Sequence, residues 1–288
     1  MITNEPQVAT AAANKPAVPP AADATYLERM ETTLEVAEQS VAAAEAIDQV
    51  SAPVEKKAEK KQTALAVSVV IPVYNERETI TEIVERVRAV GVHHEIIIVD
   101  DFSLDGTRDV LLTLAREPDV HVLMHGYNRG KGAALRTAFA MAEGEIILIQ
   151  DADLEYDPAD YPKLLAPIER GEADVVYGSR FLENAHQDPS RMHRFGNWLL
   201  TACSNLFTGQ QLTDMETCYK AFRREILFAL KIEQNRFGFE PEITAKISRL
   251  GYKITEVPIS YHARGYEEGK KIGLRDAISA IGCILKYR

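Results

Sequence analysis

Short apolar runs alternate with segments of helical periodicity from residue 66 to residue 180. The runs are AVSVVIPVY (66–74), EIIIVDD (95–101), VHVLMH (120–125), EIILIQDAD (145–153) and ADVVYGSR (173–180). The segments between them carry apolar residues at steps of three and four. Strands that are apolar throughout and alternate with helices are typical of a mostly parallel sheet covered on both faces. We therefore predict an α/β fold with a mostly parallel central sheet.

Each predicted strand ends in a short polar motif. These motifs are PVYNE (72–76), DDFSLDGT (100–107), GYNRGKG (126–132), QDADLE (150–155) and GSR (178–180). In an open parallel sheet, ligands bind outside the carboxyl ends of the strands, and these ends share one edge. The sequence therefore predicts a binding site that all five motifs build along one rim of the sheet.

The motif after the fourth strand begins an acidic run, with carboxylates at Asp151, Asp153, Glu155 and Asp157. Buried carboxylates are costly without partners, so we expect cations here. Mg²⁺ or Mn²⁺ fits, because either ion takes oxygen ligands from one or two carboxylates and completes its shell with substrate phosphates. If the strand continues, Asp151 and Asp153 point to opposite sides. We then expect Asp153 to bind the metal directly and Asp151 to assist through water or a sugar hydroxyl.

Each motif also has a simpler interpretation when it is taken alone. Asp157 before Pro158 is a common helix start, and Asp105 before Gly106 is a common turn. NRGKG could be merely a loop before a helix. The occurrence of all the motifs in order, at successive strand ends, is what favours a functional site.

Net charge and cysteine content limit the classes of binding partner and the cellular compartment that we expect. A formal net charge of −10 leaves no excess positive charge for nucleic acid. The sparse, odd set of cysteines has no metal-binding spacing, which indicates a reducing compartment. We see no signal-peptide pattern, and no apolar run approaches the roughly 20 residues of a membrane-spanning helix. We expect a cytoplasmic protein with peripheral membrane contact at most.

The chain divides near residue 65. Residues 1–25 are rich in Ala and Pro without periodicity, which predicts disorder. Residues 26–50 carry an amphipathic stripe, which predicts a marginal helix that would form on a partner or in an oligomer. Residues 51–62 have the composition of a charged linker. We expect 1–64 to be an N-terminal extension that the chemistry does not need.

Four segments in fixed order give the chain a family resemblance: VSVVIPVYNERETI, IIIVDDFSLDGT, NRGKGAALRTAF and IQDADLEYDP. Together they resemble the family 2 glycosyltransferases, which are inverting, nucleotide-sugar-dependent enzymes with the GT-A fold. Within this family the chain is most similar to the dolichyl-phosphate mannose or glucose synthase branch, which loads a sugar onto a polyprenyl phosphate. The resemblance covers residues 66–288. It implies a catalytic domain at 65–288, with a nucleotide-sugar half (65–178) and an acceptor half (179–288).

On the donor side, the resemblance implies that a UDP- or GDP-sugar binds together with Mg²⁺ or Mn²⁺. The residues that match donor binding are Pro72, Tyr74, Glu76, Asp101, Lys131 and Asp151. Tyr74 can pack against the base, and Asp101 can accept a hydrogen bond from it. The residues that match the metal site are Asp151, Asp153 and Glu155. Because relatives often have Gln at position 155, a carboxylate there would either strengthen the metal site or repel the diphosphate.

On the acceptor side, the resemblance implies phosphate or acceptor binding by Arg180, Arg194, Asn197, Arg264, Lys270 and Lys271. Relatives often carry Ser at the position of Asn197. The catalytic residues that it implies are Asp151, Arg180 and Asp214. Asp214 is the candidate for a base or an acceptor-orienting residue, with Glu216 and Glu240 behind it.

The implied chemistry is one displacement at C1 of the sugar, which inverts the anomeric centre. Metal and cationic side chains stabilise the charge on the departing phosphate. A lipid phosphate is already ionised, whereas a hydroxyl acceptor, as in cell-surface polysaccharide synthesis, needs a base and stays an alternative. A nucleotidyltransferase is less favoured, because PVYNERE (72–78) stands where that class has a Gly-rich loop. A non-catalytic scaffold is disfavoured by the retained acidic, tyrosine and arginine positions.

A stripe near the C-terminus bears on membrane contact. Its apolar residues share one helix face: Leu274, Ile278, Ile281 and Leu285. Basic residues lie on both sides of the stripe. Such a helix could lie at a membrane interface or pack on the domain, and the pattern leaves both options open.

Overall fold

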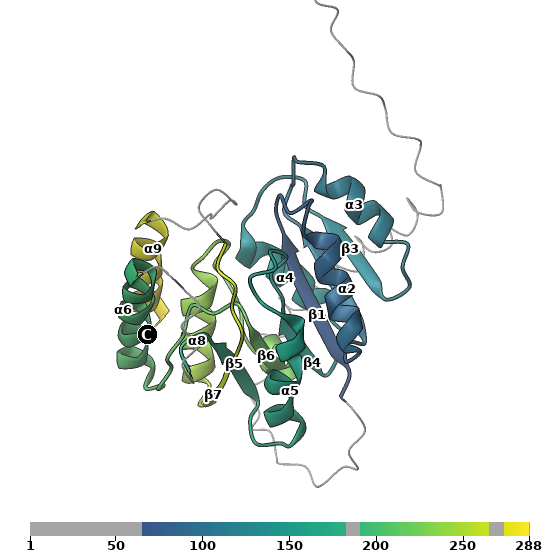
Figure 1. Ribbon diagram of the computed structural model, residues 1–288. Helices are drawn as coiled ribbons and strands as arrows, with labels where there is room; N and C mark the ends of the chain where they lie inside the picture. The colour runs from purple at the N-terminus through teal and green to yellow at the C-terminus, as the bar shows by residue number, and fades with distance from the viewer. Residues whose placement is uncertain (1–64, 183–190, 265–273, 288) are drawn as a thin grey trace, which may run out of the picture.

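The structure is a computed structural model that describes residues 65–182, 191–264 and 274–287 (Figure 1). The predicted extension 1–64, with its helix at 26–50, lies outside the described residues, and so do Lys270 and Lys271. Every other residue that the sequence predicts for the site lies within the described ranges.

A seven-stranded sheet forms the centre of the fold, with the strand order β3-β2-β1-β4-β6-β5-β7 (Figure 1). The strands are β1 Val67–Val73, β2 Glu95–Asp100, β3 Val120–Met124, β4 Ile146–Ile149, β5 Val175–Ser179, β6 Lys220–Arg223 and β7 Ile254–Pro258. Neighbouring strands are parallel except where β6 pairs with β4 and β5. The predicted mostly parallel α/β sheet is confirmed.

Helices connect the strands and cover both faces of the sheet (Figure 1). They are α2 Ile80–Val90, α3 Thr107–Leu114, α4 Lys131–Met141, the 3₁₀ turn η1 Pro158–Asp160, α5 Tyr161–Glu169, α6 Arg191–Thr208, α7 Arg224–Phe228, α8 Phe239–Arg249 and α9 Leu274–Tyr287. α2 confirms the helical periodicity predicted for the segment between the first two strands. Its residues Ile80, Ile83, Val84 and Val87 are all buried.

The central strands are buried on both faces, which explains why their sequences do not alternate between apolar and polar residues. All six residues of β2 and six of the seven residues of β1 are buried. Burying one Val, Leu or Ile side chain contributes about 1.5–3 kcal/mol. This packing fixes the ends of the strands and, with them, the polar motifs of the rim.

Two details of the sheet differ from the sequence prediction. β4 ends at Ile149, so Asp151 and Asp153 lie in a turn and not on opposite faces of a continuing strand. The sequence does not predict β6, because KAFR has no apolar run, and this strand depends on pairing with β4 and β5. Since β6 is antiparallel to both, β4 and β5 still point the same way. Their carboxyl ends share the rim with those of β1 and β2, as predicted.

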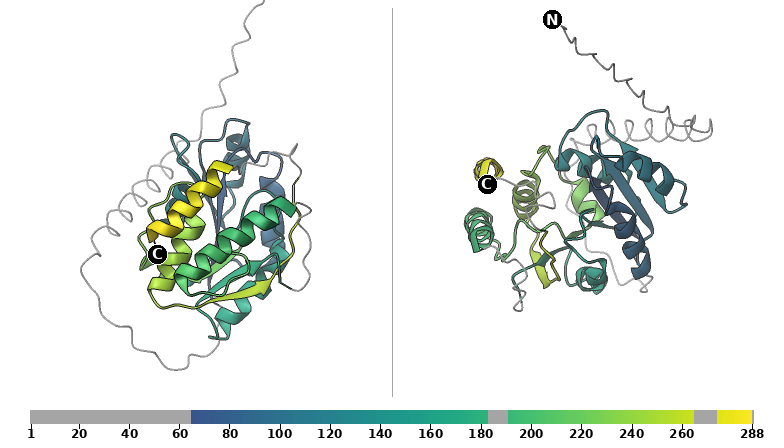
Figure 2. Two further views of the ribbon diagram at one scale, coloured as in Figure 1. Left: turned by 90° about the vertical axis from the view of Figure 1, so that its left-hand side faces the viewer. Right: turned by 45° about the horizontal axis from the view of Figure 1, so that its top comes forward.

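In the acceptor half, α6 and α9 lie side by side on one face of the molecule, next to α8 (Figure 2). α9 packs inward through Ala280, Cys283, Ile284 and Tyr287. Its residues Ile281 and Leu285, which belong to the predicted stripe, are exposed. The helix therefore packs on the domain and still presents an apolar edge.

Candidate active site

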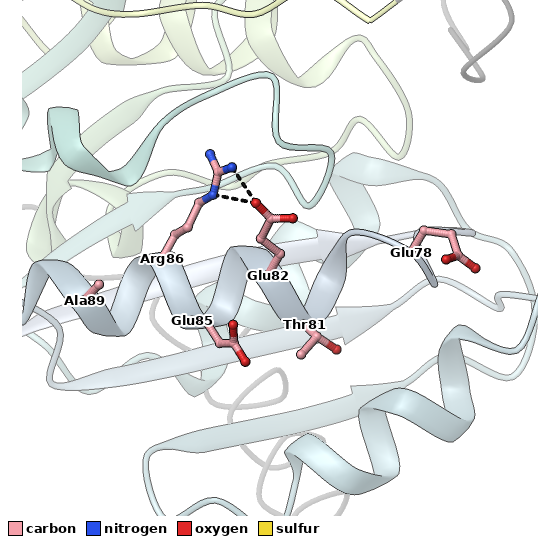
Figure 3. Close-up of a pocket in the computed structure, with 6 residues that line it drawn as sticks. All are labelled: Glu78, Thr81, Glu82, Glu85, Arg86 and Ala89. Carbon is pink, nitrogen blue, oxygen red and sulfur yellow. Dashed lines mark hydrogen bonds and ion pairs between the residues drawn. The ribbon is translucent and has the colours of Figure 1, made fainter.

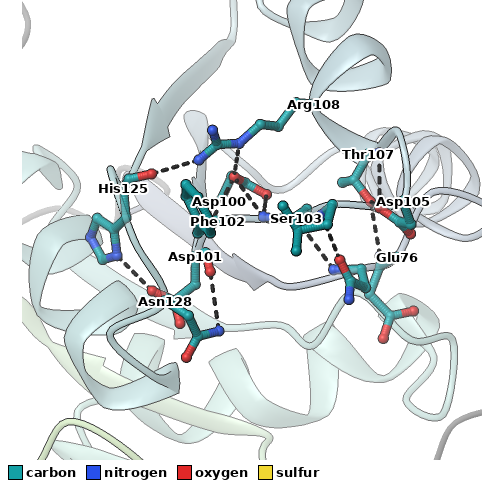
Figure 4. Close-up of polar contacts among 12 residues, drawn as sticks. Glu76, Asp100, Asp101, Phe102, Ser103, Asp105, Thr107, Arg108, His125 and Asn128 are labelled. Carbon is teal, nitrogen blue, oxygen red and sulfur yellow. Dashed lines mark hydrogen bonds and ion pairs between the residues drawn. The ribbon is translucent and has the colours of Figure 1, made fainter. Parts of the chain in front are cut away.

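The loops after β1 and β2 are tied together by hydrogen bonds from backbone to side chain (Figure 4). The amide of Asn75 donates to Ser103 Oγ at 2.8 Å, and the amide of Glu76 donates to Thr107 Oγ1 at 3.0 Å. In return, the amide of Leu104 donates to Asn75 Oδ1 at 2.9 Å. The motif DDFSLDGT therefore holds the motif PVYNE in place, which is one reason for the two to occur together.

Asp101 is a buried anchor at the end of β2 (Figure 4). Its carboxylate lies 2.7 Å from His125 Nδ1 and accepts hydrogen bonds from the amides of Arg129 at 2.8 Å and Gly130 at 2.6 Å. Burial raises the pKa of Asp101, but the bonds from His125 and the two amides outweigh burial and lower it. The predicted contact of Asp101 with a base stays a prediction. Tyr74 is half-buried directly after β1, where a stacking residue is expected.

The glycines of NRGKG allow a close approach between two segments of the chain. A Cβ on Gly130, whose φ is +96°, would overlap the backbone of Asn235. A Cβ on Gly132 would overlap the carbonyl of Gln234. This motif therefore docks the loop before α8 onto the start of α4. Lys131, between the two glycines, is placed beside the acidic motif.

Asp151 forms an ion pair with Lys131, whose Nζ lies 2.9 Å from Asp151 Oδ1. The same ammonium group lies 3.5 Å from Glu240 Oε1. Burial alone lowers the pKa of Lys131, but the charges of Asp151 and Glu240 overcome this effect and raise the pKa well above its usual value. Lys131 therefore stays charged and links the acidic motif to α8.

Asp153 faces a different cation. The guanidinium of Arg264 lies 3.3 Å from Asp153 Oδ2, and it donates to both carboxylate oxygens of Glu76 at 3.0 and 3.1 Å. Arg264 therefore joins the end of β1, the turn after β4 and the segment that follows β7. Arg264, predicted for the acceptor side, thus contacts both Glu76, predicted for the donor, and Asp153, predicted for the metal.

Glu155 and Asp157 have contacts of another kind. Glu155 accepts hydrogen bonds from the hydroxyl of Tyr261 at 2.8 Å and from the amide of Arg264 at 3.0 Å, so both its oxygens hold the segment after β7. These contacts favour a structural role for Glu155 over the predicted metal role. Asp157 accepts a hydrogen bond from the amide of Ala159 and caps η1, in agreement with the simpler interpretation of that position.

Asp151 and Asp153 are the carboxylates that fit a divalent cation. No cluster of three or more His, Cys, Asp or Glu side chains suited to a metal occurs in the described part of the chain. Mg²⁺ and Mn²⁺ need no such cluster, because one or two carboxylates suffice when substrate phosphates complete the shell. Both carboxylates are partly exposed, so an ion from the solvent can reach them. The residues present therefore fit the predicted metal.

Arg180 and Asp214 form a buried bidentate ion pair. The guanidinium of Arg180 donates to the two oxygens of Asp214 at 2.7 and 2.8 Å, and it lies over the ring of Tyr261. Burial lowers the pKa of Arg180, but the charge of Asp214 overcomes this and raises it well above its usual value. Asp214 is fully buried, so its geometry suits the positioning of Arg180 better than proton abstraction. Its predicted role as a base stays untested.

α6 carries the predicted acceptor residues Arg194 and Asn197, and its residue Thr201 contacts the loop that carries Asp214. Thr201, one turn after Asn197, accepts a hydrogen bond from the amide of Met215. Both polar atoms of the Asn197 side chain are buried and have no hydrogen-bond partner in the described structure. Arg194 is exposed at the start of the same face. The helix thus presents one cation and one unsatisfied amide on the acceptor side.

Sequence reasoning missed Gln150, whose buried side chain hydrogen-bonds to the backbone of the acidic motif. Its Oε1 accepts hydrogen bonds from the hydroxyls of Tyr161 and Tyr219, both at 2.7 Å. Its Nε2 donates to the carbonyl of Asp151 at 2.8 Å. Gln150 is fully buried, and a polar residue at the end of an otherwise apolar strand was the available signal.

A hollow on the outer surface of α2 lies apart from these residues (Figure 3). It is lined by Glu78, Thr81, Glu82, Glu85, Arg86 and Ala89. Arg86 is paired with Glu82, and Glu78 and Glu85 make no ion pair within the described part of the chain (Figure 3). Its charge suits neither a diphosphate nor a lipid phosphate, so we do not assign it to the site.

Comparison with known proteins agrees with the resemblance seen in the motifs. The sequence profile of "Glycosyl transferase family 2" matches residues 68–229. "Glycosyltransferase AglJ" of Haloferax volcanii is 32% identical over 200 residues, 69% of this chain and 64% of that protein. "Undecaprenyl-phosphate mannosyltransferase" of Micrococcus luteus is 33% identical over 217 residues, 73% and 88% of the two chains. "Undecaprenyl-phosphate 4-deoxy-4-formamido-L-arabinose transferase" of Shewanella sediminis is 30% identical over 71% of this chain and 61% of that protein.

Solved structures share the fold. Glucosyl-3-phosphoglycerate synthase of Mycobacterium tuberculosis, in complex with UDP, has a TM-score of 0.62 and 22% identity over 77% of this chain and 80% of that chain. The same enzyme in complex with Mn²⁺ and UDP-glucose has a TM-score of 0.62 and 20% identity over 88% and 82%. At this identity the likeness extends to the fold alone, and it agrees with the predicted GT-A architecture.

The chain spans less than two thirds of the length of the Haloferax and Shewanella relatives.

Proposed function

The chain belongs to glycosyltransferase family 2, and on that basis we propose that it is a metal-dependent hexosyltransferase that moves a sugar from a nucleotide diphosphate to a polyprenyl phosphate. The relatives support this acceptor, because the Micrococcus and Shewanella proteins are named for undecaprenyl phosphate. The donor is a UDP- or GDP-sugar. The anomeric centre is inverted.

The rim offers a separate place to each part of the donor. Tyr74 and Asp101, after β1 and β2, hold the nucleoside. Asp151 and Asp153, after β4, hold Mg²⁺ or Mn²⁺ with the diphosphate. A bound divalent ion supplies the positive charge that the departing diphosphate needs. Arg264 lies between Glu76 and Asp153, within reach of the same phosphates.

The Arg180–Asp214 ion pair is the main observation that favours a phosphate acceptor over a hydroxyl acceptor. Asp214 has both oxygens engaged by Arg180 and is fully buried, so it is poorly placed to take a proton from a hydroxyl. A phosphate acceptor needs no base but does need cations beside it. Arg180 and Arg194 supply such cations on the acceptor side, and Asn197 adds a neutral amide donor. Lys270 and Lys271 are further predicted cations outside the described residues.

The reaction then needs only positioning and charge compensation from the protein. An ionised oxygen of the lipid phosphate attacks C1 of the sugar from the face opposite the diphosphate. The bond from C1 to the diphosphate oxygen breaks as the new bond forms, and the nucleoside diphosphate leaves with that electron pair. No proton moves in this step. Arg180 offsets the repulsion between the incoming and departing anions.

The acceptor half also offers a surface for the bilayer. Among the described residues no helix combines the length and apolarity that crossing a bilayer requires. α6 exposes Phe195, Trp198, Leu199 and Leu206, and the neighbouring α9 exposes Ile281 and Leu285. We include peripheral binding of this surface to the membrane in the proposal.

The cysteines are free thiols, which supports the expected cytoplasmic compartment.

A donor panel tests the proposal. The protein is incubated with MnCl₂, undecaprenyl phosphate in detergent, and UDP-glucose, UDP-galactose, UDP-N-acetylglucosamine or GDP-mannose in turn. We expect one donor to yield a lipid-linked sugar of the predicted mass, and we expect EDTA to abolish the product. Transfer to a hydroxyl acceptor with no lipid-phosphate product would contradict the proposal.

A further inference from the structure

Two carboxyl oxygens, one on a residue that pairs with Lys131, the partner of the acidic motif, and one in the loop before β6, are buried and have no hydrogen-bond partner in the described part of the chain: Glu240 Oε2 and Glu216 Oε1. The whole Glu240 residue is only 5% exposed. An unpartnered buried carboxyl oxygen costs about 1–3 kcal/mol or more. Such a cost is expected where a ligand supplies the missing donors.

Both residues are held firmly in place. Glu240 lies in the first turn of α8, with its other oxygen 3.5 Å from Lys131 Nζ. Glu216 belongs to the loop between Asp214 and β6. The fully buried Lys220 donates to the backbone carbonyls of Met215 and Thr217, on either side of Glu216.

Lys220 does not neutralise the two glutamates directly. Its ammonium group is committed to the two carbonyls and lies 4.5 Å from the centre of the Tyr177 ring. Within the described ranges it makes no ion pair with a carboxylate. Burial, followed by the charge of Glu240, raises the pKa of Glu216 to about 8. The two carboxyl groups are therefore near enough to influence each other.

The charge around these oxygens limits what they can bind. An anion would be repelled by Glu240 and Asp151. A second metal ion is disfavoured, because Lys131 and Lys220 already bring two positive charges to the cluster. A neutral ligand with several hydroxyl groups suits both oxygens, since hydroxyls donate to carboxylates without adding charge.

The strand order indicates which part of the substrate reaches them. The nucleoside lies at the ends of β1 and β2 and the diphosphate at the end of β4, so the sugar extends towards β6 and β5. Lys131 joins Asp151 to Glu240 in that same direction. This direction follows from the proposed function.

We infer that Glu216 and Glu240 form the subsite for the donor sugar, in which their unpartnered oxygens accept hydrogen bonds from two of its hydroxyl groups. The inference rests on the proposed function and names the residues that select the sugar. A sugar that lacks a contacted hydroxyl leaves a buried oxygen unsatisfied again. Sites that bind a hydroxyl in this way discriminate strongly against analogues without it.

The test compares nucleotides with and without a sugar. Binding of UDP, GDP and the four nucleotide sugars named above is measured by calorimetry in MnCl₂ for the wild type, Glu240→Gln and Glu216→Gln. Glu85→Gln is the matched control, because Glu85 is an exposed carboxylate on α2. We expect each site variant to weaken binding of the preferred nucleotide sugar by about tenfold, because Glu240→Gln makes a charged acceptor neutral and Glu216→Gln replaces a carboxyl group, largely protonated near neutral pH, with an amide. Binding of the matching nucleoside diphosphate should change less than twofold.

Other results would overturn the inference. Unchanged affinity for the nucleotide sugar would remove both glutamates from the subsite. Equal losses for the sugar-free and the sugar-bearing nucleotide would instead place them in the support of the metal or the fold. If Glu240→Gln does not fold, Glu216→Gln decides the outcome, because Glu216 has no ion pair in the described structure to lose. A wild type that binds none of these nucleotides would overturn the proposed function, and the subsite with it.

Discussion

Three residues other than glycine have a positive φ among those described, and all three follow strands that end at the site. They are Asn75, Phe102 and Leu154, with φ values of 55°, 70° and 61°. This backbone conformation costs an ordinary residue about 1–2 kcal/mol. Asn75 recovers part of this cost by accepting a hydrogen bond from the amide of Leu104. Leu154 turns the chain between Asp153 and Glu155, so these two carboxylates meet different partners.

The acidic run leads to a prediction about its individual members. Asp153→Asn should lower sugar transfer at least 100-fold, because it removes the charge of the carboxylate expected to bind the metal. The melting temperature should stay close to that of the wild type, since Asp153 is partly exposed. Asp157→Asn is the control, as Asp157 caps η1, and it should keep most activity. Near-normal turnover of folded Asp153→Asn in saturating Mn²⁺ would refute the prediction.

Glu216 gives a prediction about stability and pH. Its pKa is about 8 in the folded protein, against 4.5 as its ordinary value. Between these two values the folded state keeps a proton that the unfolded chain has lost, so the free energy of unfolding contributed by Glu216 falls as pH rises. Glu216→Gln removes this pH dependence. Its advantage over the wild type should grow from pH 5 to pH 8 by roughly 3–4 kcal/mol.

Urea unfolding at the two pH values measures this difference. The groups that act on Glu216 are Glu240, Lys220, Arg180 and Asp214. A difference between the variant and the wild type that is the same at pH 5 and pH 8 would show that Glu216 does not titrate in this range.

At the scale of elements, α6 and α9 lie side by side (Figure 2). Both helices expose large apolar side chains. Trp198 is 61% exposed, and interfacial helices often place Trp at the headgroup level. We expect Trp198→Ser to reduce binding to vesicles of phosphatidylcholine and phosphatidylglycerol by about fivefold or more. Transfer to a detergent-dispersed acceptor should change much less.

Sedimentation with the vesicles measures this binding. Leu112→Ser is the control, because Leu112 is also exposed but belongs to α3, which lies far from α6 and α9 (Figure 1). Equal binding by wild type and Trp198→Ser would exclude the apolar side chains of α6 and α9 as the membrane surface.

Elements whose apolar pattern is strong were predictable from the sequence, and those that depend on distant partners were not. The stripe of α2 and the uniform burial of β2 could be read directly, because hydrophobic periodicity determines both. β6 could not, since KAFR forms a strand only between β4 and β5. The early end of β4 also escaped prediction, because the chain turns there into contacts with Lys131 and Arg264, which lie far away in sequence.

The residues of the site also divide into those that the sequence predicted and those whose contacts it could not predict. Strand-end motifs predicted that Asp151 and Lys131 lie at one rim, whereas Asp214 was expected near Arg180 only from the family resemblance. Their pairing could not be predicted, because charged groups at one rim have several partners of similar energy. The role of Glu155 depends on Tyr261, which only the tertiary structure brings near.

At the scale of the whole molecule, the five strand-end motifs of the rim all lie between residues 72 and 180, and the family profile matches residues 68–229. We therefore predict that a shortened protein starting at Ala64 folds and keeps its turnover within about twofold on a detergent-dispersed acceptor. Circular dichroism and the transfer assay, with the full chain as control, measure both properties. A shortened protein that is insoluble or inactive would show that residues 1–64 belong to the catalytic unit.

The central claim is that the rim holds two anions, the donor diphosphate and a lipid phosphate. The most direct test supplies the same radiolabelled donor with undecaprenyl phosphate or with undecaprenol, which differ only in the phosphate. We expect labelled lipid from the phosphate alone, and we expect Arg194→Ala to raise the concentration of lipid phosphate required by about tenfold. Equal or greater labelling of undecaprenol would contradict the account.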